Sequence, residues 1–535
     1  MAAREKANIL WISFEDTNPF YGCYGDSVAR TPHLDGLAAQ GCRWNHCFST
    51  AGVCAPARSA VITGMYPISI GTHHMRTTHT DPATPELPTP YSVVVPHYVK
   101  CFPEYLRAAG YYCTNNVKTD YQFDPPPTAW DELGTEAHWR HRPDPEQPFF
   151  AVFNLARTHE SGMWSDKDAD PIFKPDEMPV PPYFPDTPKV RQALARMYTH
   201  IAANDHELGL LLQQLAEDGL AENTFIFNWS DHGPLPRGKR WPYDSGIHVP
   251  LIVRGPGIAP GSLSDDLVST IDLGPTVLSL AGVELPCHLQ GQAFLGPQAE
   301  SPREYVYASR DRHDTAYDMV RAVRDKRFKY IRNYHPELPY LLWIPYRNRH
   351  PIVQEMWRLH AAGELNETQS LIFKARPAEE LYDTEVDPYE IDNLAGDPDF
   401  SSALRRLRKA LDDWIEDVGD LGEMPESQMV HQWYPDGVQP QTATPVFIPI
   451  GAENCGEEAS TTSVVMSAPL LLQLHCTTQG ASIAYTFERG AKPRWLLYTE
   501  PLRLKPGNIS VRAKAARIGY RDSEEKQVTF AIKAA

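Results

Sequence analysis

Short apolar runs alternate with longer amphipathic stretches over the first part of the chain. Brief runs rich in Ile, Leu, Val, Phe or Trp predict buried strands at residues 8–14, 148–154, 224–229 and 249–254. Apolar residues spaced three to four apart predict helices at residues 32–41, 102–110 and 190–220. Because strands alternate with helices, we expect an α/β fold over residues 1–300, with a mainly parallel sheet flanked by helices.

The pattern changes near residue 300. Alternating apolar and polar residues predict antiparallel strands at 320–324 and 328–332, and a helix is predicted near 402–417. Residues 301–420 are therefore expected to form a smaller α+β subdomain that packs on the first domain and completes the site.

The last two segments differ from both. Residues 421–462 are rich in Pro, Gly, Gln, Glu and Thr and are predicted to be a linker or wrapping segment. Short alternating strands predict a small β-sandwich over residues 463–535. Its strands Ser482-Ile-Ala-Tyr-Thr-Phe487 and Ser510-Val-Arg-Ala-Lys514 resemble those of the fibronectin-like modules appended to bacterial glycan-degrading enzymes.

Composition adds limits on compartment and partners. The 535 residues are 42% hydrophobic and 22% charged, which is ordinary for a soluble globular protein, and no run reaches the length of a membrane helix. No apolar signal core precedes the first strand, so a cytoplasmic location is expected, or a periplasmic or secreted one if a leader was removed. The net charge of −18 opposes nucleic-acid binding. An anionic substrate would need local cations, such as those of Arg237-Gly-Lys239-Arg240.

Polar pairs follow two of the predicted strands directly. Glu15-Asp16 comes after the first strand and Asp231-His232 after the third. Because the carboxyl ends of parallel strands meet at one edge of a sheet, these pairs are expected to be neighbours. Three carboxylates and an imidazole predict a divalent-cation site, for Ca²⁺ or Mg²⁺, with Mn²⁺ open because of the imidazole. The alternative is that each pair caps a following helix.

The segment Cys54-Ala-Pro-Ala-Arg58 has the Cys-x-Pro-x-Arg spacing that formylglycine-generating enzymes read in type I sulfatases. Over roughly residues 7–400 the chain resembles these sulfatases, which belong to the alkaline phosphatase superfamily. Three segments resemble the branch with N-sulfoglucosamine sulfohydrolases and bacterial glycan exosulfatases: Gly71-Thr-His-His-Met-Arg76, Asn116-Val-Lys-Thr-Asp-Tyr121 and Ser309-Arg-Asp-Arg-His313. The motifs that carry the resemblance occur in the family order: Asn8-Ile-Leu-Trp-Ile-Ser-Phe-Glu-Asp16, Thr31-Pro-His-Leu-Asp-Gly-Leu-Ala38, the cysteine motif, Ser230-Asp-His-Gly233, Lys239 to Gly246, and Glu380-Leu-Tyr-Asp-Thr-Glu-Val-Asp-Pro-Tyr-Glu390.

The resemblance implies a role for each matching residue. Glu15, Asp16, Asp231 and His232 would hold the metal, usually calcium in this family. Cys54 would be converted by a maturase to formylglycine, whose hydrate attacks sulfur while the metal acts as a Lewis acid. The remaining matches are the cations Arg58, Lys118 and Lys239, which would bind the sulfate oxygens, and His159, which would protonate the leaving oxygen.

The sequence departs from the family pattern at a few positions. Glu15 stands where Asp is common, and Ala57 where serine is usual. Asp120 stands where the family often has a histidine two residues after the first lysine. The base that expels sulfate is therefore open between Asp120 and the histidines of Gly71-Thr-His-His-Met75, which are His73 and His74.

The branch implies a sulfated sugar as the substrate, and the protein could form oligomers. Candidate residues for binding the sugar are His74, Arg76, Arg310, Asp311, Arg312 and His313. Each could instead belong to a structural salt bridge. Two other functions remain open: a phosphate or phosphonate monoester hydrolase with the same machinery, and a non-catalytic glycan-binding protein with an unmodified Cys54.

Overall fold

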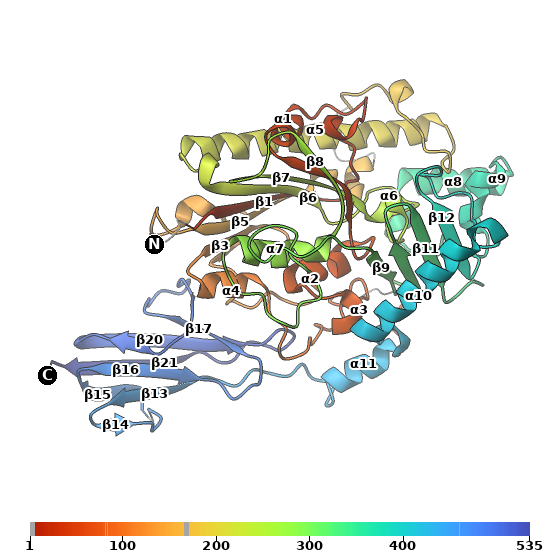
Figure 1. Ribbon diagram of the computed structural model, residues 1–535. Helices are drawn as coiled ribbons and strands as arrows, with labels where there is room; N and C mark the ends of the chain where they lie inside the picture. The colour runs from red at the N-terminus through yellow and green to blue at the C-terminus, as the bar shows by residue number, and fades with distance from the viewer. Residues whose placement is uncertain (1–5, 81, 83, 165–170, 460, 535) are drawn as a thin grey trace.

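The computed structural model describes residues 6–80, 82, 84–164, 171–459 and 461–534 (Figure 1). Its α-helices are α1 (Pro32–Gln40), α2 (Cys54–Thr63), α3 (Pro67–Ile70), α4 (Pro103–Ala108), α5 (Pro188–Glu217), α6 (Asp244–Ile247), α7 (Leu273–Leu280), α8 (Pro351–Ala362), α9 (Glu367–Ser370), α10 (Ser401–Val418) and α11 (Glu426–Trp433). The strands of the first 300 residues are β1 (Asn8–Phe14), β2 (Cys42–Phe48), β3 (Tyr112–Asn116), β4 (Glu132–Leu133), β5 (Phe149–Leu155), β6 (Thr224–Ser230), β7 (His248–Arg254) and β8 (Ser262–Ser269). The later strands are β9 (Val306–Arg310), β10 (Val320–Arg324), β11 (Phe328–Asn333), β12 (Glu379–Asp383), β13 (Val446–Gly451), β14 (Asn454–Cys455), β15 (Ser463–Ser467), β16 (Leu470–His475), β17 (Ser482–Thr486), β18 (Leu496–Leu497), β19 (Leu502–Leu504), β20 (Gly507–Ala516) and β21 (Lys526–Lys533).

An eight-stranded sheet forms the centre of the large domain, in the order β4-β3-β5-β1-β6-β7-β2-β8. Strands β3, β4, β5, β1 and β6 are parallel, which confirms the predicted α/β fold with a mainly parallel sheet. The predicted strand at 249–254 exists as β7, but it runs antiparallel to both β6 and β2. An antiparallel neighbour needs no crossover helix, and the connection from β6 to β7 contains only the four-residue helix α6.

Each face of the sheet is covered by helices because the apolar residues of β1 alternate between two cores. Leu10, Ile12 and Phe14 pack in the core shared with α5, and α1 lies on the same side (Figure 1). Ile9 and Trp11 pack in the opposite core, where α2, α4 and α7 lie. Burial on both faces fixes the strand register and therefore the positions of the residues that follow each strand.

The smaller subdomain is a four-stranded antiparallel sheet, β12-β11-β10-β9, with α10 packed across it (Figure 1). The terminal module has two sheets, β14-β13-β16-β19 and β15-β21-β20-β17-β18, around a separate apolar core. The segment 421–462, predicted as linker or wrapping segment, contains α11 and β13. Because β13 pairs with β16, the module begins earlier than residue 463.

The module is joined to the large domain by specific contacts. The Lys100 ammonium donates to the Ser482 hydroxyl at 2.8 Å, and the Arg107 guanidinium donates to the Trp495 carbonyl at 2.6 Å. Ile518 of the module is buried in the core of the large domain. Among the helices that the structure describes, none combines the length and apolar character needed to span a bilayer.

Candidate active site

The ends of four parallel strands bring the predicted polar residues together. Glu15-Asp16 follows β1 and Asp231-His232 follows β6, and Phe14 and Ser230 are paired in the β1–β6 ladder. The Asp16 backbone N–H donates to Asp231 Oδ1 at 3.1 Å, which closes the edge between the two strands. The predicted proximity of the two polar pairs is therefore found in the structure.

The arrangement fits a divalent cation. The ligand atoms of Asp16, Cys54, Asp231 and His232 lie within 4.8 Å of one another, and so do those of Glu15, Asp16, Cys54 and His159. All these residues except His159 are buried. Each group holds two carboxylates, and Asp16 belongs to both. Carboxylates held this close need positive charge between or beside them, and carboxylate oxygens with an imidazole nitrogen suit Ca²⁺, Mg²⁺ or Mn²⁺.

The orientation of His232 supports a cation at this place. Nδ1 lies 3.0 Å from the Gly233 carbonyl and can only donate to it, so the neutral ring has its lone pair on Nε2. Burial lowers the pKa of His232 against the opposing effect of Asp231 and Asp16, which favours this neutral ring. Nε2 lies 3.2 Å from Asp16 Oδ1 and 3.1 Å from Cys54 Sγ. The lone pair on Nε2 can therefore accept from the Cys54 thiol or bind a cation held together with Asp16.

Cys54 is the first residue of α2, and its sulfur belongs to both groups of ligand atoms. Its side chain is buried, and burial raises the pKa of the thiol well above its ordinary value, with Lys239 opposing and Asp16 adding to the shift. The thiol is therefore protonated at neutral pH, whereas thiol nucleophiles act as thiolates. As an unmodified side chain, Cys54 is poorly suited to attack a substrate.

Three cations surround the cysteine. Arg58 lies one helical turn after Cys54, with Nε 2.9 Å from Asp231 Oδ2. Its Nη2 has no hydrogen-bond partner among the residues that the structure describes, so an anionic ligand could accept from it. Lys118 contacts Glu15, and Lys239 contacts Asp16 and lies 3.3 Å from Glu160. These cations suit an anion with several oxygens, such as sulfate.

The ring of His159 lies near Glu15, Asp16 and Cys54, as a member of the second group of ligand atoms. The backbone N–H of Ser161 donates to Nδ1 at 3.3 Å, so the neutral ring has its proton on Nε2. Burial lowers the pKa of His159 to about 4, with Asp16 opposing and Lys239 adding to the shift. At neutral pH the ring is therefore a hydrogen-bond donor through Nε2 without being an imidazolium.

Comparison with known proteins agrees with this geometry. A family model described as sulfatase matches residues 7–124 and 114–283, and one described as the C-terminal region of N-sulphoglucosamine sulphohydrolase matches residues 232–351. An ulvan-active sulfatase of Formosa agariphila is 41% identical, in an alignment covering 98% of this chain and 91% of the relative. The chain belongs to the sulfatase family.

Two further likenesses are more distant. The N-sulphoglucosamine sulphohydrolase of Homo sapiens is 28% identical to this sulfatase, over 83% of this chain and 95% of the relative. A protein solved in complex with its substrate D-glucosamine-2-N,6-O-disulfate shares the fold, with a TM-score of 0.55 and 18% identity, over 78% of this chain and 100% of that chain. The sulfatase is thus a sulfuric ester hydrolase with the alkaline-phosphatase-like fold.

Two positioning residues of the sulfatase were missed in the sequence. Asn154, near the end of β5, accepts from Arg58 Nη1 at 2.9 Å and donates through Nδ2 to the Lys118 carbonyl at 3.1 Å. Glu160 accepts two hydrogen bonds from Arg240, at 2.6 and 3.0 Å. A polar residue directly after the apolar run of strand 148–154 is a signal that could have identified Asn154.

Left-handed backbone conformations occur near Lys118 and at Asp16. Val117 and Asp120, on either side of Lys118, have φ values of 70° and 54°, and Asp16 has a φ of 51°. Such left-handed conformations cost on the order of 1–3 kcal/mol for residues other than glycine, most of all for a β-branched one. The fold tolerates this cost in the loop that presents Lys118 to the site.

Residues 310–313, predicted to bind substrate, all have partners within the protein. All four side chains are buried. Arg310 pairs with Asp318 at 2.8 Å, Asp311 with Arg321 at 3.0 Å and Arg312 with Glu426 at 2.6 Å, and His313 accepts from Arg240 at 3.1 Å. The first three pairs lie within the segment after residue 300, as buried charges require partners. Contacts to the large domain are made by His313 and by Arg310 and Arg312, which donate to the carbonyls of Arg240 and Met75. Arg312 also lines a cavity described below.

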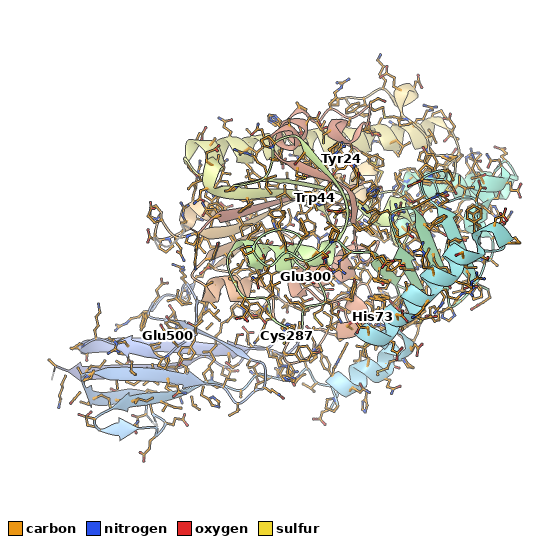
Figure 2. All side chains as sticks on the ribbon, in the orientation of Figure 1. Tyr24, Trp44, His73, Cys287, Glu300 and Glu500 are labelled. Carbon is orange, nitrogen blue, oxygen red and sulfur yellow. The ribbon has the colours of Figure 1, made fainter. Side chains whose placement is uncertain are left out.

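The candidate bases lie in different surroundings. Asp120 lies 3.7 Å from Lys118 and is partly exposed at the site. His73 lies shortly after the end of α3 (Figure 2). Asp311, Arg321 and Asp420 are near enough to affect its pKa. Burial lowers the pKa of both His73 and His74, whose rings are 4.2 Å apart. The geometry favours Asp120, and it offers no sugar-binding surface at His74, which is 4% exposed.

Proposed function

We propose that this sulfatase hydrolyses a sulfate ester or sulfamate of a saccharide, with Cys54 converted to formylglycine and a divalent metal held by Glu15, Asp16, Asp231 and His232. The observation that carries the proposal is the position of the buried Cys54. It lies at the carboxyl ends of the parallel strands, among carboxylates suited to a metal and cations suited to sulfate. The names of the relatives, an ulvan-active sulfatase and an N-sulphoglucosamine sulphohydrolase, support a saccharide substrate.

The groups to be added would supply the chemistry that the thiol lacks. A metal acts as a Lewis acid on sulfate oxygens, and a hydrated aldehyde offers one hydroxyl as nucleophile and a second to release sulfate. The side chains of the protein then have separate tasks. Arg58, through the free Nη2, and Lys118 and Lys239 would orient the sulfate and balance the charge on its oxygens.

His159 and Asp120 would have separate tasks. His159 would donate a hydrogen bond from Nε2 to the leaving oxygen and stabilise the negative charge that develops there, because Nδ1 is already occupied by the Ser161 N–H. Asp120 would take the proton when sulfate is released, and its contact with Lys118 keeps the carboxylate near the sulfate-binding cations. The exposed fraction of the Asp120 side chain, 37%, allows proton exchange with water.

The maturase is a proposed partner whose timing the structure constrains. Cys54 and Arg58 are each 4% exposed, and every residue of α2 is buried. An enzyme that reads Cys-x-Pro-x-Arg in this chain would therefore have to act before the large domain closes around α2.

The test combines peptide mass spectrometry with turnover. Protein made together with a formylglycine-generating enzyme should contain the aldehyde at position 54 and should release sulfate from members of a panel of sulfated mono- and disaccharides. An unmodified thiol with no turnover would leave only glycan binding. Faster turnover of a matched aryl phosphate or phosphonate than of the aryl sulfate would instead identify a phosphoester or phosphonate hydrolase.

A further inference from the structure

A cavity lies beside His159, at the edge of the candidate active site. It has a volume of about 330 Å³ and is lined by residues that include Arg76, Arg312, Asp314, Tyr346 and Arg349. This volume is within the range of about 300–1,000 Å³ that is typical of ligand pockets, which favour domain interfaces. Arg76 comes from the large domain, and the other four come from the segment after residue 300, so the cavity lies between the two.

Tyr346 connects this cavity with the reaction site. Its ring centroid lies 6.4 Å from that of His159 and 4.9 Å from that of Trp164. Tyr346 also lines the cavity. A saccharide whose leaving oxygen faces His159 would therefore extend past the tyrosine ring into the cavity with its next sugar.

Two of the three arginines in the cavity wall are neutralised by carboxylates. Arg76 Nε lies 2.7 Å from Asp314 Oδ1, and Arg312 makes two hydrogen bonds of 2.6 Å to Glu426. The pairing is reinforced by the backbone, since the Met75 N–H donates to the Arg312 carbonyl at 2.8 Å. These two guanidinium groups form a fixed wall.

Arg349 is different. Its side chain is exposed, and no carboxylate pairs with it in the ranges 6–164 and 171–534 as far as the structure describes them. The guanidinium lies over the Trp164 ring, 4.7 Å from its centroid, which orients the group without neutralising it. Among the described residues that line it, the cavity therefore has one uncompensated arginine, in a protein of net charge −18.

We propose that Arg349 binds the carboxylate of an acidic sugar, such as a uronate, that neighbours the sulfated sugar at Cys54. The proposal rests on the proposed function and names the class of saccharide. A planar guanidinium matches the two oxygens of a carboxylate in a bidentate pair. Sulfate, by contrast, meets three cations in the reaction site, whereas the cavity offers a single unpaired one.

The test uses three disaccharides that share the sulfated sugar turned over in the panel. The neighbouring sugar is glucuronate, the neutral glucuronate methyl ester, or glucose 6-sulfate, in both linkage orders. The wild-type kcat/KM should be about ten- to a hundredfold higher for glucuronate than for its methyl ester, which is the range of a charge-assisted hydrogen-bond pair. The difference should appear mainly in KM.

Variants of Arg349 test whether this residue causes the preference for glucuronate over its methyl ester. Arg349→Ala should reduce the preference to less than about threefold and leave the rate on the methyl ester unchanged. Arg349→Lys should keep part of the preference, since lysine has the positive charge but lacks the two parallel N–H donors of the guanidinium group. Arg358→Ala on α8, an exposed arginine paired with Glu355 at 2.9 Å, is the matched control and should keep the full preference.

Three results would overturn the proposal: equal wild-type rates on glucuronate and its ester, a preference that survives Arg349→Ala, or Arg349 dependence confined to the disulfated substrate. Sulfate release from the methyl ester by the wild type would leave the proposed function standing in each case. Loss of release from all three substrates would count against the proposed function itself.

Discussion

The catalytic cluster and the terminal sandwich are built on opposite principles. Around Cys54, carboxylates and cations are buried within a few ångströms of one another, and neighbouring backbone is strained. In the sandwich, the core is apolar, with Phe447, Val511 and Phe530 fully buried. Burial of apolar surface stabilises a fold, whereas burial of charge costs free energy that only good partners recover. Stability and chemistry should therefore respond to different mutations.

Removing the cysteine should have the largest effect. Cys54→Ala is expected to reduce sulfate release by about 10⁴-fold or more, because the covalent route disappears while binding groups remain. Sulfate release and the melting temperature are measured on the same preparation. Cys287→Ala, at an exposed cysteine, is the control and should retain full activity. Turnover by Cys54→Ala above this limit would contradict covalent catalysis.

A core substitution in the sandwich should lower stability and leave the activity of the folded protein unchanged. Phe530→Ala is expected to lower the free energy of unfolding by about 3–5 kcal/mol, as for other buried phenylalanines, without changing kcat/KM of the folded protein. Urea unfolding followed by circular dichroism gives the stability. Val465→Ala on β15, where the side chain is 59% exposed, should change it by less than about 0.5 kcal/mol. A fall in kcat/KM would show that the two regions are coupled.

Asn154 offers a smaller and sharper test within the cluster. Asn154→Ala should reduce kcat/KM by about 10²-fold, because Arg58 and the Lys118 loop both lose the amide that positions them. Inhibition by free sulfate should weaken in parallel, which a merely structural role would not predict at an unchanged melting temperature. Asn45→Ala, whose amide donates to exposed Asp265, is the control. An unaltered inhibition constant would refute the positioning role.

Acid should weaken the fold modestly. Burial lowers the pKa of His248 to about 4 and of His350 to about 3, whereas burial raises the pKa of Glu390 to about 7. At pH 5 both histidines are protonated in the unfolded chain and largely neutral in the folded chain, whereas Glu390 of the folded chain is already largely protonated at pH 6.5. The unfolded state thus binds more protons, so stability should decline by about 1.4 kcal/mol per pH unit per net proton.

Unfolding in urea at pH 6.5 and pH 5 measures this decline, and His350→Gln should make it shallower. Greater stability at pH 5 than at pH 6.5 would show that Glu390 and other carboxyl groups dominate. Because the shifts concern histidines away from Cys54, the slope should be the same in Cys54→Ala.

The strands and the catalytic cluster could be predicted because each depends on local pattern. Apolar runs identified β1, β5, β6 and β7, and the polar pairs directly after β1 and β6 identified the edge. The direction of β7 could not be predicted, since a buried run reads the same in either orientation. Strand β13 was missed because Pro449 lies within it and favoured a linker.

The substrate-binding residues were harder to predict than the chemistry. Arg312 reads as a cation near a sugar, but its partner Glu426 lies 114 residues further along the chain and is brought to it only by tertiary folding. Arg349 has no motif around it and stands out only once the paired arginines are known. Pairing between distant segments is set by the fold, and a single sequence does not display it.

The position of Tyr346 and Arg349 on a segment separate from the strand ends has an evolutionary consequence. Neither residue belongs to the groups of metal-type ligands, and neither contributes a cation near Cys54. Replacements between residues 345 and 349 should therefore change which neighbouring sugar the enzyme prefers, and the residues around Cys54 that carry out hydrolysis would stay the same. Divergence among related enzymes should be concentrated in this short stretch, and a chimera exchanging it would be the economical route to a new specificity.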